Sequence, residues 1–212
     1  MSNVQVRLMS SSGSPAEWVA LLPRLLGALF YYSPTAPQSQ PLVEQLPHLH
    51  ELFPWRDADA MRRRCLRMPD WQAQGLQEEF ETLFEAQGNM IAPPWGSVYL
   101  DRENLLMGAS TARYREFLRR NALHFAAQDQ EPEDQFGLLL MALAWLLEND
   151  RRPAARELLE QHLMPWSGRY LERLRDNPVS MAYAWLAEVT CQWLTDLQAL
   201  HDLHPAQQRL YY

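Results

Sequence analysis

The chain has 212 residues, of which 47% are hydrophobic and 21% are charged, and its formal net charge is −7. This length is enough for one domain with a full hydrophobic core, and the composition is that of a globular protein. The acidic balance argues against nucleic acid as the main partner, because phosphate binding requires a basic surface.

Nothing near the start of the chain suggests export. The first residues, MSNVQVRLMSSSGSP, contain no apolar stretch of signal-peptide length. The longest apolar run, residues 138–147, is about half of a membrane span. Cys65 and Cys191 lie far apart and indicate reduced thiols. We therefore expect a cytoplasmic protein with no stable membrane insertion.

The first helix is predicted from Ser14 as far as the prolines at positions 34 and 37. Ser14 is a suitable N-cap, Pro15 suits the first helical position, and Glu17 completes a capping box. Apolar residues then recur at three-to-four spacing, and Pro23 is expected to kink the helix without ending it. The stripe consists of Trp18, Leu22, Leu25, Leu26, Leu29 and Phe30. Residues 1–13 are expected to be a flexible segment.

Helical periodicity continues along the rest of the chain. Further helices are predicted over residues 41–52, 71–87, from about 110, 132–149, 153–163, 165–175 and 178–200. Gly88 suits the C-terminal cap of the second of these, and Asn177 suits the N-cap of the last. No stretch alternates with period two, so we predict an all-α fold. The expected architecture is a compact single-domain bundle of about eight or nine helices over residues 14–205, followed by a C-terminal tail, 206–212.

The stretch IAPPWGSVYLDRE, residues 91–103, interrupts this helical pattern. Its two prolines remove backbone donors, so the stretch is predicted to be neither helix nor central strand. A loop tryptophan braced by prolines, such as Trp95 after Pro93 and Pro94, can anchor a bound peptide at low entropic cost. It can equally cap the hydrophobic core, and the residues alone leave both interpretations open.

The stretch EPEDQFG, residues 131–137, also has two interpretations. Pro132 at a first helical position, followed by Glu133 and Asp134, is favourable helix-start chemistry, since carboxylates complement the positive end of the helix dipole. Carboxylates beside a cleft could instead hold an arginine guanidinium through bidentate hydrogen bonds.

The sequence offers little catalytic chemistry. It contains no GxSxG, GxxxxGK[ST], HExxH or GxGxxG motif. His201 and His204 have the spacing of two metal ligands on a helix, but histidines near a helix C-terminus more often interact with the dipole. We therefore expect neither an enzyme nor a metal site.

Three segments together resemble a known family. They are PPWGSVYLDRE with LMGAS just after it, EPEDQFGLLLMALAWLLEN, and HLMPWSGRYLERL, and LLGALFYYSP near the start fits as well. In this order and at these intervals they resemble the TorD/DmsD-type chaperones, the redox-enzyme maturation proteins that bind twin-arginine signal peptides. Within that family the chain is most similar to the DmsD branch.

The resemblance implies a function and a set of binding residues. Such chaperones are cytoplasmic, all-helical and non-catalytic, and they hold the leader of a molybdopterin-dependent reductase subunit until its cofactor is inserted and Tat export proceeds. We therefore expect a monomer without a cofactor, whose partners are that leader and components of the Tat translocase. Residues linked to leader binding fall on Tyr31, Phe80, Leu83, Phe84, Pro94, Trp95, Gly108, Asp134 and Gln135. Supporting positions are Pro93, Glu131, Pro132, His162 and Trp166.

The chain departs from the family pattern at two of these positions. Gln135 stands where the family has histidine, and Phe80 where relatives often have tryptophan. The groove is therefore expected to be shallower or tuned to another leader. Two alternatives remain open: a nucleotide-responsive chaperone that binds GTP, although the sequence has no phosphate loop, and a helical carboxylate or metal hydrolase that uses Glu131, Asp134 and His162.

Overall fold

The computed structural model describes residues 19–85, 89–102, 106–124 and 131–212. These residues are helical and include no strand, so the predicted all-α fold is confirmed. The α-helices are α1 (Leu21–Tyr31), α2 (Gln40–Val43), α3 (Ala58–Leu66), α4 (Leu76–Phe80), α5 (Gly96–Leu100), α6 (Ala109–Arg120), α7 (Phe136–Glu148), α8 (Arg152–Glu157), α9 (Met164–Arg175) and α10 (Met181–His201). A 3-10 helix, η1 (Leu46–Glu51), and two π-helical segments, η2 (Glu81–Glu85) and η3 (Leu158–Leu163), complete the order. None of these helices is long and apolar enough to cross a lipid bilayer.

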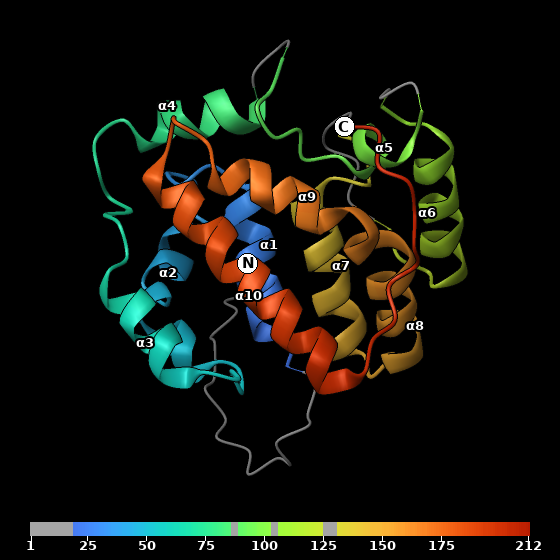
Figure 1. Cartoon of the computed structure of the whole chain (residues 1–212), viewed down its shortest axis with the longest axis horizontal. Helices are drawn as coiled ribbons and strands as arrows, with labels where there is room; N and C mark the ends of the chain where they lie inside the picture. The colour runs from blue at the N-terminus through green and yellow to red at the C-terminus, as the bar shows by residue number, and fades with distance from the viewer. Residues whose placement is uncertain (1–18, 86–88, 103–105, 125–130) are drawn as a thin grey trace.

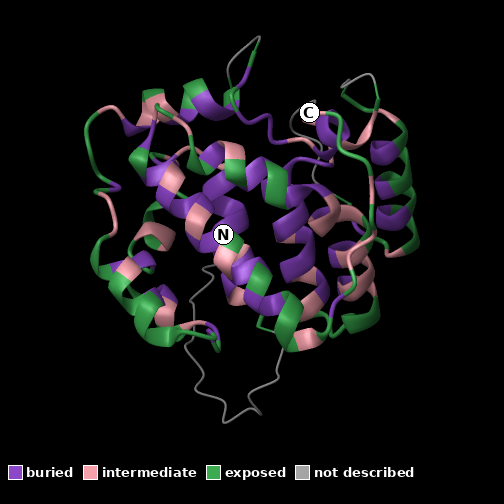
Figure 2. Cartoon of the chain, viewed as in Figure 1, coloured by how far each residue is buried: buried purple, intermediate pink, exposed green. Residues whose placement is uncertain are grey.

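The centre of the molecule is the contact between α1 and α7, which is the most extensive between any two elements (Figure 1). Both helices are buried along most of their length, and the shorter peripheral elements carry most of the exposed residues (Figure 2). The two backbones approach closely because a glycine lies on each side, Gly27 on α1 and Gly137 on α7. A Cβ atom on Gly137 would lie 2.6 Å from the carbonyl oxygen of Gly27.

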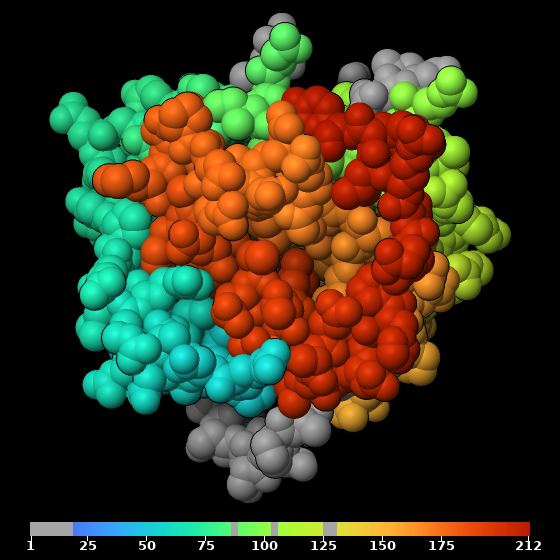
Figure 3. Space-filling model, viewed as in Figure 1, coloured from blue at the N-terminus to red at the C-terminus, as the bar shows by residue number. Residues whose placement is uncertain are grey.

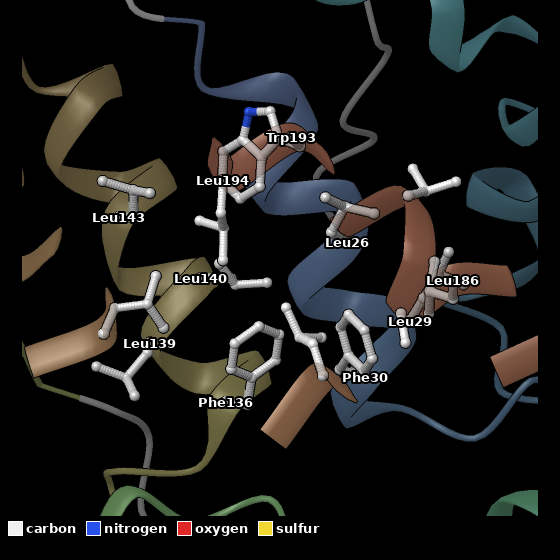
Figure 4. Close-up of a cluster of buried hydrophobic side chains, with 14 of the residues drawn as sticks. Leu26, Leu29, Phe30, Phe136, Leu139, Leu140, Leu143, Leu186, Trp193 and Leu194 are labelled. Atoms are coloured by element: carbon white, nitrogen blue, oxygen red, sulfur yellow. The ribbon is translucent and has the colours of Figure 1, made fainter. Parts of the chain in front are cut away.

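The third helix that contributes to the core is α10, which crosses in front of α1 in Figure 1. Figure 4 shows side chains from these three helices meeting in one apolar cluster. The labelled ones are Leu26, Leu29, Phe30, Phe136, Leu139, Leu140, Leu143, Leu186, Trp193 and Leu194. Burial of aromatic and branched side chains from distant parts of the chain is therefore what holds the helices together.

The N-terminal half differs from the sequence prediction in several places. The predicted cap at Ser14 lies outside the described residues, and α1 begins at Leu21. Pro23 therefore lies in the first turn, where an N–H has no intrahelical partner, so it costs no hydrogen bond and kinks no preceding turn. Helix α3 was not predicted, because only Met61 and Cys65 of its residues are buried.

The predicted helix over 71–87 also begins later than expected. Gly75 adopts a φ of 97°, a left-handed conformation that glycine tolerates, and α4 starts after it. Trp71, the expected start, instead packs its ring against Tyr183 at a centroid distance of 5.3 Å. The predicted cap at Gly88 lies outside the described residues.

The C-terminal half is closer to the prediction. Segment η3 leads directly into α9, so Pro165 lies in the first turn of α9 and does not separate two helices. The helix predicted from 178 begins at Met181, because Ser180 caps it by accepting from the Tyr183 N–H at 3.3 Å.

The tail after α10 is a strap that packs along the surface. The N–H of Ala206 donates to the carbonyl of Glu160 at 2.8 Å, and that of Tyr211 to the carbonyl of Tyr99 at 2.9 Å. The hydroxyl of Tyr212 donates to the carbonyl of Met90 at 2.9 Å. Figure 3 shows this segment in red, crossing one face of the molecule towards the residues that precede and form α5.

Candidate functional site

The structure brings together three segments that the sequence singled out. The Phe136 N–H donates to the carbonyl of Pro94 at 2.7 Å, and the Gly96 N–H donates to the carbonyl of Asp134 at 3.0 Å. These bonds form a short antiparallel bridge between residues 94–96 and 134–136. The side chain of Gln135 then joins this bridge to the end of α1, since its Nε2 donates to the carbonyl of Phe30 at 3.1 Å.

Segment 91–100 is irregular only in its first part. Pro93 and Pro94 are buried and belong to no helix, and Trp95 follows with φ −108° and ψ 131°. The next residues form the short helix α5, so the prediction that the stretch contains no helix was wrong. Gly96 allows Trp166 to pack closely against the start of α5, because a Cβ atom on Gly96 would lie 2.9 Å from the indole nitrogen of Trp166.

Trp95 is held at the edge of the core and not inside it. Its side chain is partly exposed, and its indole N–H donates to the carboxylate of Glu131 at 2.6 Å. Two buried prolines before it and a hydrogen bond to a charged acceptor fix the orientation of the ring. Trp95 is thus a preorganised aromatic surface of the kind that loses little entropy on binding.

Asp134 has a structural task that its sequence position did not reveal. The residue is 4% exposed, and its carboxylate accepts from the Ser97 N–H at 2.7 Å, at the start of α5. Burial raises the pKa of Asp134, and the hydrogen bond from the Ser97 N–H and the nearby hydroxyls of Ser97 and Thr111 offset this only in part. The prediction that Asp134 belongs to the first turn of the following helix was wrong, because it supports α5 instead.

Gln135 is the residue that begins α7. Its side-chain oxygen accepts from the Leu138 N–H at 3.0 Å, as an N-cap does. Because the residue is 4% exposed and its amide is bonded at both ends, it holds α1 against α7. Any contribution of Gln135 to leader binding would therefore come from the position of these helices.

Gly108 is also explained by a local contact. The carboxylate of Asp101 accepts from the N–H and from the hydroxyl of Ser110, the latter at 2.6 Å, and so caps α6. A Cβ atom on Gly108 would meet the Cγ atom of Asp101 at 2.8 Å. The absence of a side chain at position 108 therefore allows the Asp101 carboxylate to approach the start of α6.

The aromatic candidates lie deeper than a binding surface requires. Phe80 and Leu83 are each 1% exposed and Phe84 is 7% exposed. The centroid of the Phe84 ring lies 6.4 Å from that of Phe30, and the Phe30 centroid lies 5.0 Å from that of Phe136. In this conformation the three α4–η2 residues support the site from beneath, and their direct contact with a leader stays a prediction.

The remaining candidates form the rim and the floor of the site. Tyr31 is partly exposed and its ring lies 4.9 Å from that of Tyr32, whereas Pro132 is buried. Trp166 is 1% exposed, donates to the carbonyl of His162 at 2.8 Å, and stacks on Tyr99 at 5.3 Å.

A cleft of about 560 Å³ opens between α6 and the η3 region beside these residues. It is lined by Ala112, Arg113, Glu116, Arg120, Glu157, Gln161, His162 and Gln208. Burial lowers the pKa of His162 to about 4, so this histidine is neutral at physiological pH.

The hydrolase alternative has no support in this geometry. Among the described residues, no group of three or more histidine, cysteine, aspartate or glutamate side chains is arranged to hold a metal ion. Glu131 is bonded to Trp95, and Asp134 supports α5. Two of the three proposed members, Glu131 and Asp134, are therefore engaged in structural contacts.

Sequence reasoning missed one pair at this site. Arg115 on α6 binds the carboxylate of Glu133 through both Nε and Nη2, at 2.8–2.9 Å. Partial burial raises the pKa of Glu133, but the hydrogen bonds from Arg115 outweigh this effect and the pKa is lowered. The two residues are 18 positions apart, so no local spacing could have indicated the pair.

The structural task of Asp134 leads to a stability prediction. Burial raises the pKa of Asp134 above its unfolded value of 3.8, so the folded state binds the proton more tightly than the unfolded state. The resulting contribution to the free energy of unfolding is complete below pH 3.8 and is lost as pH rises through the folded-state pKa. Asparagine retains an acceptor for Ser97 without a buried charge. We expect Asp134→Asn to lie within about 1 kcal/mol of the parent at pH 7, and Asp134→Ala to lose about 2 kcal/mol, by urea unfolding. Equal losses in both variants would contradict the capping role.

Comparisons with known proteins agree with the resemblance found in the sequence. Residues 38–172 match the nitrate reductase delta subunit family. The chain is 40% identical over 183 residues to the Tat proofreading chaperone DmsD of Salmonella typhimurium, which covers 84% of this chain and 90% of that relative. It is 24% identical over 208 residues to the chaperone protein TorD of a Psychrobacter species, covering 89% and 94%.

A solved structure shows the same fold. It is that of a redox enzyme maturation protein from Archaeoglobus fulgidus, with a TM-score of 0.53 and 17% identity, and the match covers 90% of this chain and 99% of that one. At this identity the likeness concerns the fold alone, whereas the sequence matches concern the family. The chain therefore belongs to the nitrate reductase delta subunit family, among its TorD/DmsD-type maturation chaperones.

Proposed function

We propose that this protein is a cytoplasmic Tat proofreading chaperone that binds the twin-arginine leader of a molybdopterin-dependent reductase subunit. It holds the precursor during cofactor insertion and then releases it to components of the Tat translocase. The relatives named Tat proofreading chaperone support this assignment. In this proposal the protein acts as a monomer and needs no cofactor of its own.

The observation that carries the proposal is the arrangement around Trp95. A partly exposed indole, braced by buried prolines, lies beside the acidic stretch at residues 131–134. Exposed apolar side chains flank it in the sequence: Ile91 before Trp95, and Leu106 and Met107 before Gly108. A basic and apolar peptide needs this combination of an aromatic surface, apolar contacts and carboxylates.

Binding of three related peptides tests the proposal. The leader of a molybdopterin reductase is compared with versions in which both arginines are replaced by lysine or by alanine. We expect the twin-arginine peptide to bind most tightly and the alanine peptide least, because carboxylates attract either cation but only arginine binds bidentately. Calorimetry at low salt provides the affinities. Equal affinities for all three would remove the carboxylates from the binding surface.

The client itself is identified by capture from anaerobically grown cells. Recovery of a molybdoenzyme precursor on the immobilised chaperone, and its absence when the precursor lacks its leader, is the expected result. Recovery independent of the leader would contradict leader recognition.

A further inference from the structure

The carboxylates of the acidic stretch differ in what they already bind. Asp134 accepts from the start of α5 and is buried, and Glu131 accepts from the indole of Trp95. Glu133 binds a guanidinium, that of Arg115 on α6. Of the three, Glu133 thus shows the geometry that recognition of a leader arginine requires.

The guanidinium of Arg115 contacts both oxygens of the Glu133 carboxylate. The Nε atom of Arg115 lies 2.9 Å from Oε1 and 2.8 Å from Oε2, and Nη2 lies 2.8 Å from Oε2. A planar guanidinium satisfies a carboxylate in this way, whereas a lysine ammonium is a point charge. The carboxylate therefore stands in a position that suits arginine better than lysine.

The pair is also accessible and easily exchanged. The side chain of Arg115 is 45% exposed and that of Glu133 is 29% exposed. Ion pairs at this level of exposure contribute little to stability, because water solvates both partners when they separate. An incoming guanidinium could replace that of Arg115 while Arg115 turns to solvent.

We propose that Arg115 is an internal competitor, which occupies on Glu133 the position taken by an arginine of the twin-arginine leader. This inference rests on the proposed function. It adds that Glu133 selects arginine over lysine and that Arg115 opposes leader binding. The exchange replaces one intramolecular ion pair by an intermolecular one of the same geometry. Leader binding is thereby weakened for any cation that cannot contact both carboxylate oxygens of Glu133 at once.

The two partners of the pair should have opposite effects on binding. Arg115→Ala is expected to tighten binding of the twin-arginine leader by about threefold to fivefold, because the leader no longer has to displace an exposed ion pair. Glu133→Gln is expected to weaken it by about tenfold, because a charge-assisted contact is lost. Glu133→Gln should also reduce the preference for the twin-arginine over the twin-lysine peptide, while Arg115→Ala should not.

The same helix provides a matched control. Arg119 also contacts both oxygens of a carboxylate, that of Glu116, with hydrogen bonds of 2.9 Å from Nε and 2.7 Å from Nη2, and both residues are exposed. Arg119→Ala and Glu116→Gln change the net charge as the test variants do. Calorimetric titration at one ionic strength, for both peptides, should show affinities within twofold of the parent for these controls.

The outcomes separate this inference from the proposed function. If Arg115→Ala binds the leader no more tightly than Arg119→Ala, Arg115 is not a competitor. If Glu133→Gln weakens both peptides equally, Glu133 does not select arginine. In either case the parent still binds the leader and the proposed function stands. Failure of the parent to bind the twin-arginine leader would overturn both proposals.

Discussion

Gly137→Ala is expected to lower the free energy of unfolding by about 3 kcal/mol, as overpacking of a tight core contact does. Alanine is normally the better helix former, so the loss must come from tertiary contact. The added Cβ atom would lie 2.6 Å from the carbonyl oxygen of Gly27, which is backbone and cannot turn away. It would also approach Tyr31 and the side chain of Gln135, each to 3.0 Å, so α1 and α7 must separate.

Gly168→Ala is the matched control. Gly168 lies within α9, and a Cβ atom there would meet nothing within 4 Å. Without a clash, the higher helix propensity of alanine should raise stability by about 0.5–1 kcal/mol. Chemical denaturation with intrinsic fluorescence gives both values. A Gly137→Ala variant as stable as the parent would show that the α1–α7 contact can relax.

Trp95→Ala is expected to weaken leader binding by about 2 kcal/mol or more, which is the effect of losing an aromatic anchor. The change removes the braced ring and leaves the Glu131 carboxylate without its indole donor. Trp95→Phe should fall between the parent and alanine, because it retains a ring but not the N–H group. Calorimetry measures the affinity, and thermal unfolding checks that the fold survives.

Trp145→Ala controls for loss of a partly exposed tryptophan. Trp145 lies on α7, and the guanidinium of Arg151 lies 5.6 Å from the centroid of its ring. Its removal should leave leader affinity unchanged. If Trp95→Ala retains full affinity but unfolds at a much lower temperature, Trp95 serves the core and not the leader.

The helical fold was predictable because long apolar stripes with helical period require a helix in any context. The stripes of α1, α7 and α10 supply the core in the structure as well. Short elements were less predictable. Helix α3 buries only two side chains and depends on the cap from Asp57, whose carboxylate accepts from the Ala60 N–H at 2.8 Å.

The composition of the site was predictable, but its internal roles were not. The segments around Trp95, Asp134 and the end of α1 were identified from their residues, and the structure brings them together. Asp134 resembles the start of a helix in sequence, yet it caps α5, which lies 37 positions away. Capping by a distant residue leaves no local pattern, and neither does the pairing of Arg115 with Glu133.

The strap after α10 has a consequence for how the site could open. The ring of Tyr212, the last residue of the strap, contacts the guanidinium of Arg173 at 4.3 Å and the ring of Tyr99 at 5.5 Å. These contacts and the bonds to Met90 and Tyr99 are few, and residues 204–212 are themselves exposed or only partly buried. Local unfolding of the strap therefore requires much less free energy than global unfolding. A transient opening of this kind would release residues 90–99 on one side while the α1–α7 core remains intact, which gives the Trp95 region a source of conformational freedom separate from the stability of the protein.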